Sequence, residues 1–332
     1  MASTATCDFA MPMHERIHAD LYRCDAPDYP QPGLPEECAT APARIIASAQ
    51  ECGHGEHVRL RASPEAALQL IRSVGSAAIV VIPEGGWTVL VAMTGRPLLM
   101  ADGIEWQLEP GRCLTWDRRL ALVATADDAW FCLHGAEAAW LRACPGSALV
   151  RELFPVEDTC PPTLSERVAH LFDEIRTAPA DESGLSWRIR DIVSDLHRTQ
   201  LSLRNLLPRC PGRTHNRKRW TMLRLLRVRH VIASDQSVRA NLPALSSRIN
   251  CSCGHLSRIH RGVFGETPIE FAQRMRLRHA LKLVAQTDLA FCDIAEATGF
   301  DSPSSFTRAF RQCHSMTPTQ ARASISRAVQ AG

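Results

Sequence analysis

Lysine is almost missing from this 332-residue sequence. Only two of its 38 basic residues are lysines, Lys218 and Lys282, and all the others are arginines. The planar guanidinium of arginine suits phosphate groups and guanine edges, although so strong a bias is also what an unusual genomic base composition produces. The scarcity of lysine alone therefore excludes no class of protein, and the placement of the arginines along the chain has to decide.

Paired cysteines and catalytic signatures are missing as well. The 13 cysteines are scattered, odd in number and form no Cys-x-x-Cys motif, which is typical of reduced thiols and argues against a disulfide framework. The sequence contains no nucleophile elbow, no P-loop and no glycine-rich dinucleotide fingerprint. We therefore expect neither an enzymatic activity nor a cofactor.

Long apolar runs are also absent. The most apolar stretch, "AAIVVIPEGGWTVLVAMTG", is interrupted by Pro83, Glu84 and two glycines. The first thirty residues contain several acidic residues and lack the unbroken apolar core of a signal peptide. Because a membrane-spanning helix needs about 20 consecutive apolar residues, we expect a cytoplasmic protein that does not enter the membrane.

The charge that is present is divided unequally along the chain. From Arg204 to the carboxy terminus there are 21 Lys and Arg against 7 Asp and Glu, a balance of +14, whereas the preceding residues carry 17 against 28, a balance of −11. Such asymmetry makes the carboxy-terminal part a candidate for binding a polyanion and the amino-terminal part a poor one.

The amino-terminal half is predicted to be rich in β-strands. Residues 1–42 contain many prolines and little periodicity, which indicates a loosely ordered arm. Short β-prone runs separated by turn residues follow as far as Cys144, and we assign residues 43–160 to a barrel or sandwich. One helix is predicted inside this domain in "SPEAALQLIRSVG", with Ser63 as its N-cap and Pro64 at its first position. Residues 145–163 are predicted to be a proline-rich connector.

Residues 161–220 are assigned to a helical dimerisation region and a basic linker. Helices are expected over 165–178 and 185–207, and the second carries a broken apolar stripe that fits either a dimer seam or packing against its own domain. The linker, "PRCPGRTHNRKRW" at 208–220, is either a solvated loop or a contact to phosphates. The stripe consists of Ile189, Ile192, Val193, Leu196, Leu203 and Leu207.

The stretch "GFDSPSSFTRAFRQCHSMTP", residues 299–318, predicts a turn followed by a short helix. Gly299 suits the left-handed residue that closes the preceding helix, 292–298, while Ser302 and Pro303 suit the N-cap and first position of the next. Taken alone, it fits an ordinary helical hairpin as well as a helix-turn-helix unit. A buried stripe is predicted at Phe306, Ala309, Phe310 and Cys313, and an outward face at Ser304, Ser305, Arg308, Arg311 and Gln312.

A second, similar unit precedes it. Leu242–Ile249 is a predicted helix, residues 250–252 a turn, and the helix that follows places Leu256, Ile259, His260 and Val263 inward. Its outward residues are Gly254, Ser257, Arg258 and Arg261. Because Arg258 and Arg308 are fifty residues apart at equivalent positions, we infer that the module is duplicated.

These two units, joined by "RMRLRHALKLV", resemble the carboxy-terminal domain of the AraC/XylS family of bacterial transcription regulators, and we assign residues 221–332 to such a domain. The resemblance implies an α+β chain in which a cupin-like sensor domain precedes an all-α domain with two helix-turn-helix units. The matching residues are Leu256, Ser257, Arg258, Phe264, Gly265, Pro268, Phe271, Arg276, Leu277, Ala280, Leu283, Val284, Ile294, Ala295, Gly299, Phe300, Ser302, Phe306, Arg308, Ala309, Phe310, Pro318 and Arg322.

The resemblance also implies which partners this chain has. The second helix of each unit is expected to enter the major groove of double-stranded promoter DNA, where hydroxyls and guanidinium groups read base edges. RNA polymerase, a small-molecule effector and a second copy of the chain are the other expected partners, and activation is the expected effect. We predict base contacts from Ser257, Arg258, Ser304, Ser305 and Arg308, and phosphate contacts from Arg261 and Arg311.

Three positions depart from the family pattern. Ser246 stands where an alanine is usual, Gly254 leaves one position of the first unit without a side chain, and Ser315 replaces a frequent glycine.

For the amino-terminal domain, "QLEPGRCLTW" at 107–116 looks like a cupin turn between two strands. The paired His-x-His of metal-binding cupins is absent, which argues against a metal-dependent oxygenase. Five aromatic side chains fit either an apolar pocket or ordinary core packing. They are Trp87, Trp106, Trp116, Trp130 and Phe131.

An alternative function is a metal- or thiol-responsive transcription sensor. Cys52, His54 and His57 lie within six residues, but their spacing matches no standard zinc motif, and a polar surface loop explains them as well. Cys251 and Cys253 flank the second helix of the first unit, where oxidation or metal binding would disturb DNA docking, and small half-buried residues in a turn are the other interpretation.

Overall fold

The computed structural model describes residues 46–60, 67–125, 129–144, 152–177, 182–234 and 240–330. The predicted arm at 1–42 and the predicted caps Ser63 and Pro64 lie outside the described residues. The chain divides into two compact units, Met1–Gln200 and Leu201–Gly332. The predicted helical region at 161–220 is thereby shared between the two units.

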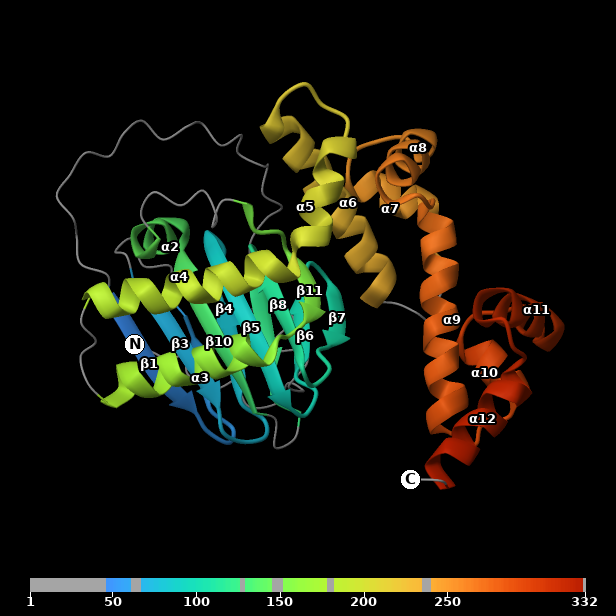
Figure 1. Cartoon of the computed structure of the whole chain (residues 1–332), viewed down its shortest axis with the longest axis horizontal. Helices are drawn as coiled ribbons and strands as arrows, with labels where there is room; N and C mark the ends of the chain where they lie inside the picture. Colours follow the sequence, from blue (N-terminus) through green and yellow to red (C-terminus); the bar gives the residue numbers. More distant parts are fainter. Residues whose placement is uncertain are drawn as a thin grey trace, which may run out of the picture. The chain divides into compact units, whose positions relative to one another are not determined.

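Two β-sheets form the first unit (Figure 1). The six-stranded sheet has the order β1-β3-β10-β5-β8-β11, and the five-stranded sheet has the order β2-β4-β9-β6-β7. The strands are β1 Ile46–Cys52, β2 His57–Arg59, β3 Ala67–Ser73, β4 Ile79–Ile82, β5 Gly86–Thr94, β6 Leu98–Ala101, β7 Ile104–Gln107, β8 Arg112–Trp116, β9 Leu120–Val123, β10 Ala129–Ala136 and β11 Val156–Thr159.

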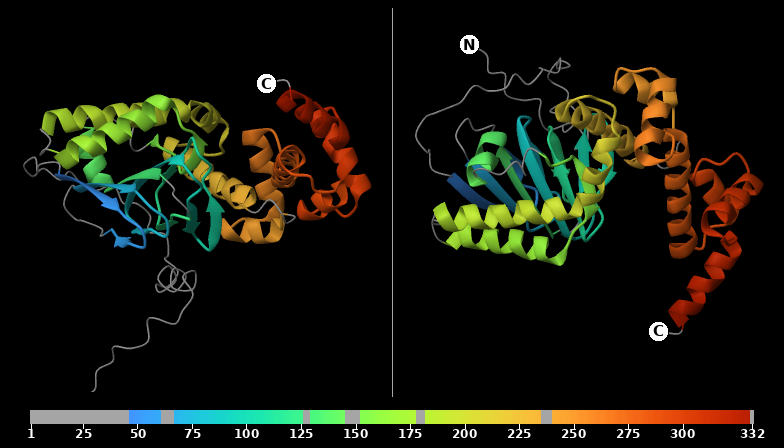
Figure 2. Two further views of the ribbon diagram at one scale, coloured as in Figure 1. Left: turned by 90° about the horizontal axis from the view of Figure 1, so that it is seen from below. Right: turned by 45° about the horizontal axis from the view of Figure 1, so that its top comes forward.

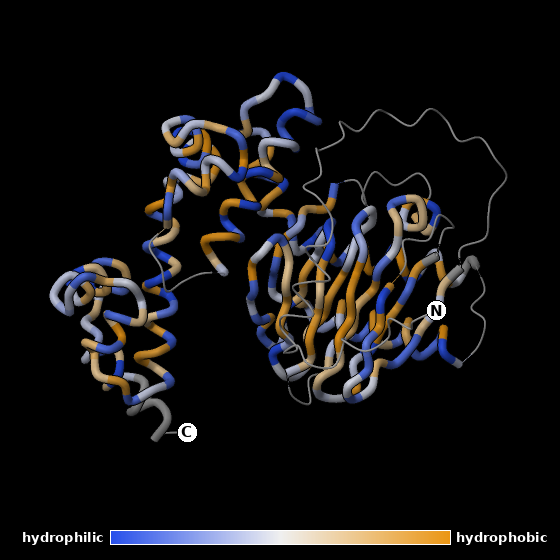
Figure 3. Tube along the Cα trace, turned by 180° about the vertical axis from the view of Figure 1, so that it is seen from behind, coloured by the Kyte–Doolittle hydropathy of each residue, from blue (hydrophilic) through white to orange (hydrophobic). Residues whose placement is uncertain are grey.

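Alternation along the central strands divides the core into two layers. In β5, Val89 and Val91 point to one face of the six-stranded sheet, and Leu90 points to the other. The layer between the sheets receives Leu90 together with residues of both sheets, so the strands are apolar over much of their length (Figure 3). The opposite layer is covered by helices.

Three helices cover the outer face of the six-stranded sheet, α2 Glu137–Ala143, α3 Pro162–Thr177 and α4 Glu182–Thr199, with α3 and α4 side by side (Figure 1). The apolar stripe of α4 is buried against this face, because Ile189, Ile192 and Leu196 are fully buried in the layer beneath the helices. Of the two interpretations of the stripe, packing against its own domain is therefore the correct one for α4.

The predicted helix 185–207 is interrupted at Gln200. The buried Gln200 side chain accepts a hydrogen bond from the backbone N–H of Phe154 at 2.8 Å and donates to Thr115 Oγ1 at 2.9 Å. These contacts hold the residue against the sheet, and the chain resumes as a separate short helix, α5 Leu201–Leu206. Leu203 and Leu207 consequently belong to the second unit and are only half-buried.

Three predictions in the first unit were wrong. Residues 67–73 of the helix expected at 63–75 form strand β3, in which Leu68, Leu70 and Ile71 alternate between the two core layers because β3 pairs with β1 and β10. Residues 156–159 of the expected connector form β11, which pairs with β8. Residues 137–143, inside the stretch expected to form short β-strands as far as Cys144, form α2. In the two strands, pairing with distant strands outweighs the local sequence preference.

The second unit is all helical. The basic stretch expected to be a linker is partly helical, because α6 begins at His215 and not at Thr221, with the backbone N–H of Lys218 donating to the Thr214 carbonyl at 3.1 Å. The elements are α5, the 3-10 turn η2 Leu207–Arg209, α6 His215–Ser234, α7 Leu242–Arg248, α8 Cys253–Phe264, α9 Pro268–Gln286, α10 Phe291–Ala297, α11 Pro303–His314 and α12 Pro318–Gln330.

Within the described segments, no helix has both the length and the apolar character needed to cross a bilayer.

Candidate nucleic-acid interface

The second helix-turn-helix unit consists of α10 and α11, as predicted. Gly299 adopts the left-handed conformation with φ of +69°, and the backbone N–H of Phe300 reaches back to the Ala295 carbonyl at 2.9 Å. Ser302 then caps α11 by accepting a hydrogen bond from the Ser305 N–H, and Pro303 occupies the first position of the helix. The tight turn is therefore set by local sequence.

The inner face of α11 is fixed by two phenylalanines. Phe306 and Phe310 are fully buried and pack with Ile294 and Ala295 of α10. The predicted stripe was wrong at Cys313, which is exposed. His314 instead closes this end of the core, with its ring centroid 4.6 Å from that of Phe310 and its Nε2 3.3 Å from the Leu277 carbonyl.

The outer face of α11 is polar and open. The predicted outward residues are all exposed, and four of them line a shallow groove with Thr307 and Thr317. Within the described part of the chain, the side chains of Arg308 and Arg311 make no hydrogen bond or ion pair. The four groove residues are Ser304, Arg308, Arg311 and Gln312.

Ser305 has a different position from the other predicted contacts. Its hydroxyl donates to the Ser302 carbonyl at 2.8 Å and accepts from the Ser302 N–H at 3.3 Å, completing a reciprocal capping box. The hydroxyl proton of Ser305 is therefore engaged in the helix cap, and base reading by this residue would have to break that hydrogen bond.

The first helix-turn-helix unit, α7 and α8, has the same arrangement built from other residues. Asn250 replaces glycine in the turn, with φ of +48°, and Ser252 caps α8 by accepting from the His255 N–H at 3.3 Å. Leu256, His260 and Val263 are buried as predicted, whereas Ile259 is only half-buried.

The outward arginines of α8 have partners within the protein. Arg258 Nη2 lies 3.1 Å from His255 Nδ1, and Arg261 Nη2 lies 2.6 Å from Glu270 Oε1. The backbone N–H of Thr267, with the Arg261 guanidinium, holds the pKa of Glu270 at about 2. Ser257 is half-buried, and the exposed Gly254 has open space where a Cβ would stand. The candidate surface of α8 is therefore less available than that of α11.

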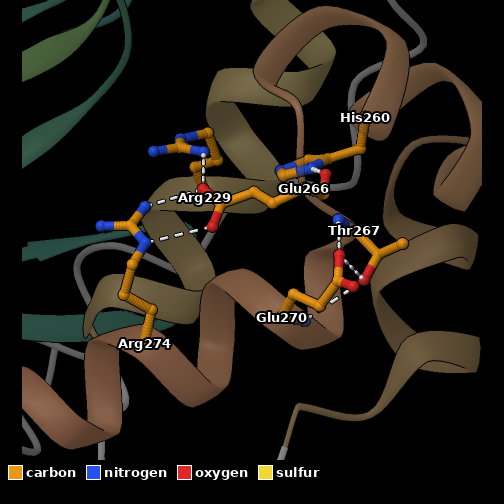
Figure 4. Close-up of polar contacts among 6 residues, drawn as sticks. All are labelled: Arg229, His260, Glu266, Thr267, Glu270 and Arg274. Atoms are coloured by element: carbon orange, nitrogen blue, oxygen red, sulfur yellow. Dashed lines mark hydrogen bonds and ion pairs between the residues drawn. The ribbon is translucent and has the colours of Figure 1, made fainter. Parts of the chain in front are cut away.

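A partly buried ionic cluster fixes α8 against its neighbours (Figure 4). Glu266 accepts hydrogen bonds from Arg229 of α6 at 3.1 Å and from Arg274 of α9 at 2.7 Å. His260 Nδ1 lies 2.5 Å from the Glu266 carbonyl. Arg229 also lies over the rings of two phenylalanines, 4.3 Å from the centroid of Phe264 and 3.8 Å from that of Phe271.

The electrostatics of this cluster favour the ionised carboxylate. Burial alone would raise the pKa of Glu266, but the hydrogen bonds and charges of Arg274 and Arg229 outweigh burial and lower it. Burial lowers the pKa of Arg229, and the Glu266 carboxylate opposes this shift. Burial also lowers the pKa of His260, which favours its neutral form. The sequence alone did not predict the cluster, because its members come from three helices and from the turn between α8 and α9.

The joining helix α9 contacts both units (Figure 2). It begins with a capping box between Thr267 and Glu270. Arg274 binds Glu266 next to the first helix-turn-helix unit. In the second helix-turn-helix unit, Arg276 donates to the Gly299 carbonyl at 2.8 Å and lies 4.9 Å from the centroid of the Phe300 ring. Its 19 residues correspond to a length of about 28 Å.

The other candidate residues do not gather into a site. Among the described residues, no three His, Cys, Asp or Glu side chains come together as a metal site. His54 Nδ1 lies 2.9 Å from Ser76 Oγ, and Cys52 is buried, which raises its pKa to about 11. Burial likewise raises the pKa of the half-buried Cys251. Cys253 Sγ lies 3.3 Å from Ser246 Oγ.

The five aromatic residues predicted to share a pocket or the core are all buried and lie in two different layers. Trp87 and Phe131 pack beneath the helices. Trp106, Trp116 and Trp130 lie between the sheets. The five side chains therefore do not line one common pocket, and core packing describes them.

Comparison with known proteins places similarity in the carboxy-terminal region. Residues 245–324 match the model of a helix-turn-helix domain family. The chain is 38% identical over 88 residues to the HTH-type transcriptional regulator GlxA of Rhizobium meliloti (strain 1021), covering 26% of this chain and 25% of that protein. It is 38% identical over 79 residues to the HTH-type transcriptional regulator CdhR of Pseudomonas aeruginosa, covering 24% of each. The chain thus spans about a quarter of the length of these relatives.

Two solved structures are similar to the chain over about a third of its length or less. The C-terminal domain of AraT, a response regulator from Geobacillus stearothermophilus, is 27% identical and covers 30% of this chain and 84% of that one, with a TM-score of 0.29. The DNA-binding domain of AdpA, solved in complex with a target DNA, is 22% identical and covers 32% of this chain and 97% of that one, with a TM-score of 0.31.

Proposed function

We propose that this chain, whose carboxy-terminal region is a helix-turn-helix domain of the AraC type, is a transcription regulator that binds double-stranded promoter DNA in the cytoplasm. The observation that supports this most directly is the outer face of α11. Arg308 and Arg311 project from a capped helix whose inner side is fixed by two buried phenylalanines, and neither side chain is engaged with another described residue. Guanidinium groups in this state are available to bases and phosphates.

In this proposal α11 supplies most of the sequence recognition. Arg308 and Ser304 contact bases, and Arg311 contacts a phosphate. On α8, Arg258 and Arg261 must first exchange their contacts with His255 and Glu270 for contacts with DNA. A helix about 28 Å long connects the two units, which suits two major-groove segments about one helical turn, roughly 34 Å, apart.

The β-rich unit is proposed to bind a small effector in the layer between its sheets. A buried polar pair supports this location: Thr88 Oγ1 lies 3.0 Å from His134 Nδ1, on neighbouring strands and on the face opposite Val89 and Leu133. Burial lowers the pKa of His134 to about 4, so the imidazole is neutral at pH 7. A few polar groups in an apolar layer are typical of small-molecule sites.

Activation through RNA polymerase and assembly as a homodimer are proposed from the family resemblance. Because the apolar stripe of α4 is buried within its own unit, a dimer would have to use another surface.

The test is the salt dependence and sequence preference of DNA binding. The full chain is expected to bind duplexes selected from a random pool with an affinity that falls as salt rises. Arg308→Ala is expected to cost about 1 to 3 kcal/mol of binding free energy and to relax the preference at one base position, measured by fluorescence anisotropy against single-base variants.

Arg96→Ala is the matched control, because it removes an arginine from a surface ion pair with Glu109 in the β-rich unit, and it should leave DNA binding unchanged. Equal binding by wild type and Arg308→Ala on every duplex would contradict the assignment of Arg308. Absence of any salt-sensitive binding by the full chain would contradict DNA binding itself.

A further inference from the structure

Two cysteines of the β-rich unit, Met1–Gln200, lie next to each other on neighbouring strands. Cys113 belongs to β8 and pairs with Asp158 of β11. One residue beyond β11, the backbone N–H of Cys160 donates to the Gly111 carbonyl at 2.9 Å, so the antiparallel pairing continues to this position. Because alternate residues of a strand share a face, Cys160 lies on the same face as Asp158 and Cys113.

That face is the helix-covered layer of the core. Cys113 is buried in this layer, and Cys160 is partly buried and packs against it. Cys160 stands directly before Pro161 and the start of α3 at Pro162, where the chain leaves the sheet. One thiol is thus held rigidly in a strand, and the other lies at a strand end that is reachable by small solutes.

The surroundings give the two thiols different acidities. The neighbouring Cys113 thiol lowers the pKa of Cys160, burial opposes this lowering, and the backbone N–H of Ser165 in the first turn of α3 favours it. The neighbouring Cys160 thiol and burial raise the pKa of Cys113. The pair therefore loses its first proton from Cys160, and the thiolate is the form of cysteine that attacks oxidants.

We propose that Cys113 and Cys160 form a dithiol that hydrogen peroxide oxidises to an intramolecular disulfide. The Cys160 thiolate attacks one peroxide oxygen, the O–O bond breaks, and hydroxide leaves as water after taking a proton, which gives the sulfenic acid at Cys160. The Cys113 sulfur then attacks the Cys160 sulfur, the S–O bond breaks, and a second water leaves. Peroxide is the two-electron oxidant, and both thiol protons end in water.

Closure needs the backbone at Cys160 to move by a few ångströms. A disulfide places the two Cβ atoms about 3.8 Å apart, whereas diagonal neighbours in an antiparallel pair of strands stand roughly 7 to 8 Å apart. Cys160 is at the end of the paired segment, so its side chain can approach β8 without breaking the β8–β11 pairs. The product would covalently fasten the start of α3 to the sheet. This proposal concerns sulfur chemistry in the β-rich unit and does not depend on the proposed DNA binding.

Tryptic peptide mapping of the full chain tests the proposal. Trypsin releases Cys113 in the peptide 113–118 and Cys160 in the peptide 152–167, each with a single cysteine. After treatment with a few equivalents of hydrogen peroxide at pH 7, the expected product is the linked pair of these peptides, two hydrogens lighter than their sum and separated again by dithiothreitol. Cys160 should be consumed at least about tenfold faster than the buried Cys144, whose pKa burial raises to about 11.

Three variants divide the steps. Cys113→Ser should leave a sulfenic acid at Cys160 that dimedone traps, and Cys160→Ser should leave Cys113 as an unmodified thiol. Cys313→Ser, which removes an exposed thiol from α11, should form the linked peptide as the wild type does.

Two outcomes would overturn the proposal. The first is a wild-type protein in which Cys113 and Cys160 both remain alkylatable after more than half of Cys313 has been oxidised. The second is a disulfide from either residue to a different cysteine. Both are read from the wild-type chain, so they hold even where a variant fails to fold.

Discussion

The two helix-turn-helix units are copies of one plan that differ at matching positions fifty residues apart. Arg261 in the first unit corresponds to Arg311 in the second, and their neighbours Glu270 and Gln320 also correspond. Glu270 and Gln320 each close a capping box with the threonine three residues earlier. Only the glutamate carries a charge, and only Arg261 is held in an ion pair.

A second difference lies in how α8 and α11 are each anchored. His260 and Glu266 of the first unit correspond to Phe310 and Met316 of the second. The first helix-turn-helix unit therefore uses a partly buried ionic cluster where the second uses two phenylalanines packed edge to face. One fold can therefore leave its arginines engaged or available, according to a few substitutions outside the arginines themselves.

Phe310→Ala is expected to destabilise the second helix-turn-helix unit more than any other substitution considered below. Removing this fully buried ring should cost about 3 to 5 kcal/mol of unfolding free energy, because the ring packs against Phe306 and His314 and leaves a cavity. Urea unfolding of the full chain, followed by hydrogen exchange of α10 and α11, measures the loss. Met316→Ala, at a position 40% exposed, is the control and should change stability by less than about 0.5 kcal/mol. Equal effects of the two substitutions would show that the phenylalanines do not anchor α11.

The matching test of the first unit is Glu266→Gln. It leaves the mostly buried Arg229 without its carboxylate, and we expect a loss of about 3 kcal/mol, at the lower end for broken buried ion pairs because Glu266 is partly exposed. Unfolding by urea at pH 7 checks the value. A loss below about 0.5 kcal/mol would mean that the aromatic rings alone hold Arg229.

Exchanging the two capping residues should exchange the availability of the arginines. Gln320→Glu is expected to engage Arg311 and weaken DNA binding, and Glu270→Gln to release Arg261 and strengthen it, each by a small factor that shrinks as salt rises, as for exposed ion pairs. Both substitutions keep an oxygen for the capping box, so helix content serves as the control. Fluorescence anisotropy at several salt concentrations measures the change. Two variants that shift affinity in the same direction would contradict this account of the arginines.

The smallest effect concerns pH. The pKa of Glu270 is about 2 in the folded chain, below its ordinary value of 4.5, so its ionised form stabilises the fold above about pH 4.5 and this contribution is lost as the pH falls toward 2. The stability difference between wild type and Glu270→Gln should therefore shrink over that interval. Urea titrations at pH 7, 4 and 2.5 follow it. A difference that stays constant from pH 7 to 2.5 would contradict this assignment.

The sequence predicted the second unit well because its signals are local. Glycine, serine and proline at 299–303 set the turn and cap, and the spacing of Phe306 and Phe310 set the buried face. The prediction was wrong at Cys313, since periodicity alone cannot tell that His314 takes that place.

Features that depend on distant partners were predicted poorly. Leu68 and Ile71 are spaced as on a helix, yet their segment lies between β1 and β10. The engagement of Arg261 and the cluster around Glu266 depend on which side chains of α6 and α9 lie nearby, which no single stretch of sequence contains. The resemblance therefore located α8 and α11 as the second helices of the two helix-turn-helix units but could not tell which of their arginines are available.

The joining helix α9 has a consequence for the DNA that the proposed function requires. It is one uninterrupted rod, fastened to the first unit through Arg274 and to the second through Arg276. A helix of fixed length fixes the distance between the two helix-turn-helix units. Each base pair inserted between the two half-sites would turn the distal half-site by about 35° and move it about 3.4 Å away. The DNA sites bound by this protein should therefore differ in base sequence but not in the spacing of their half-sites.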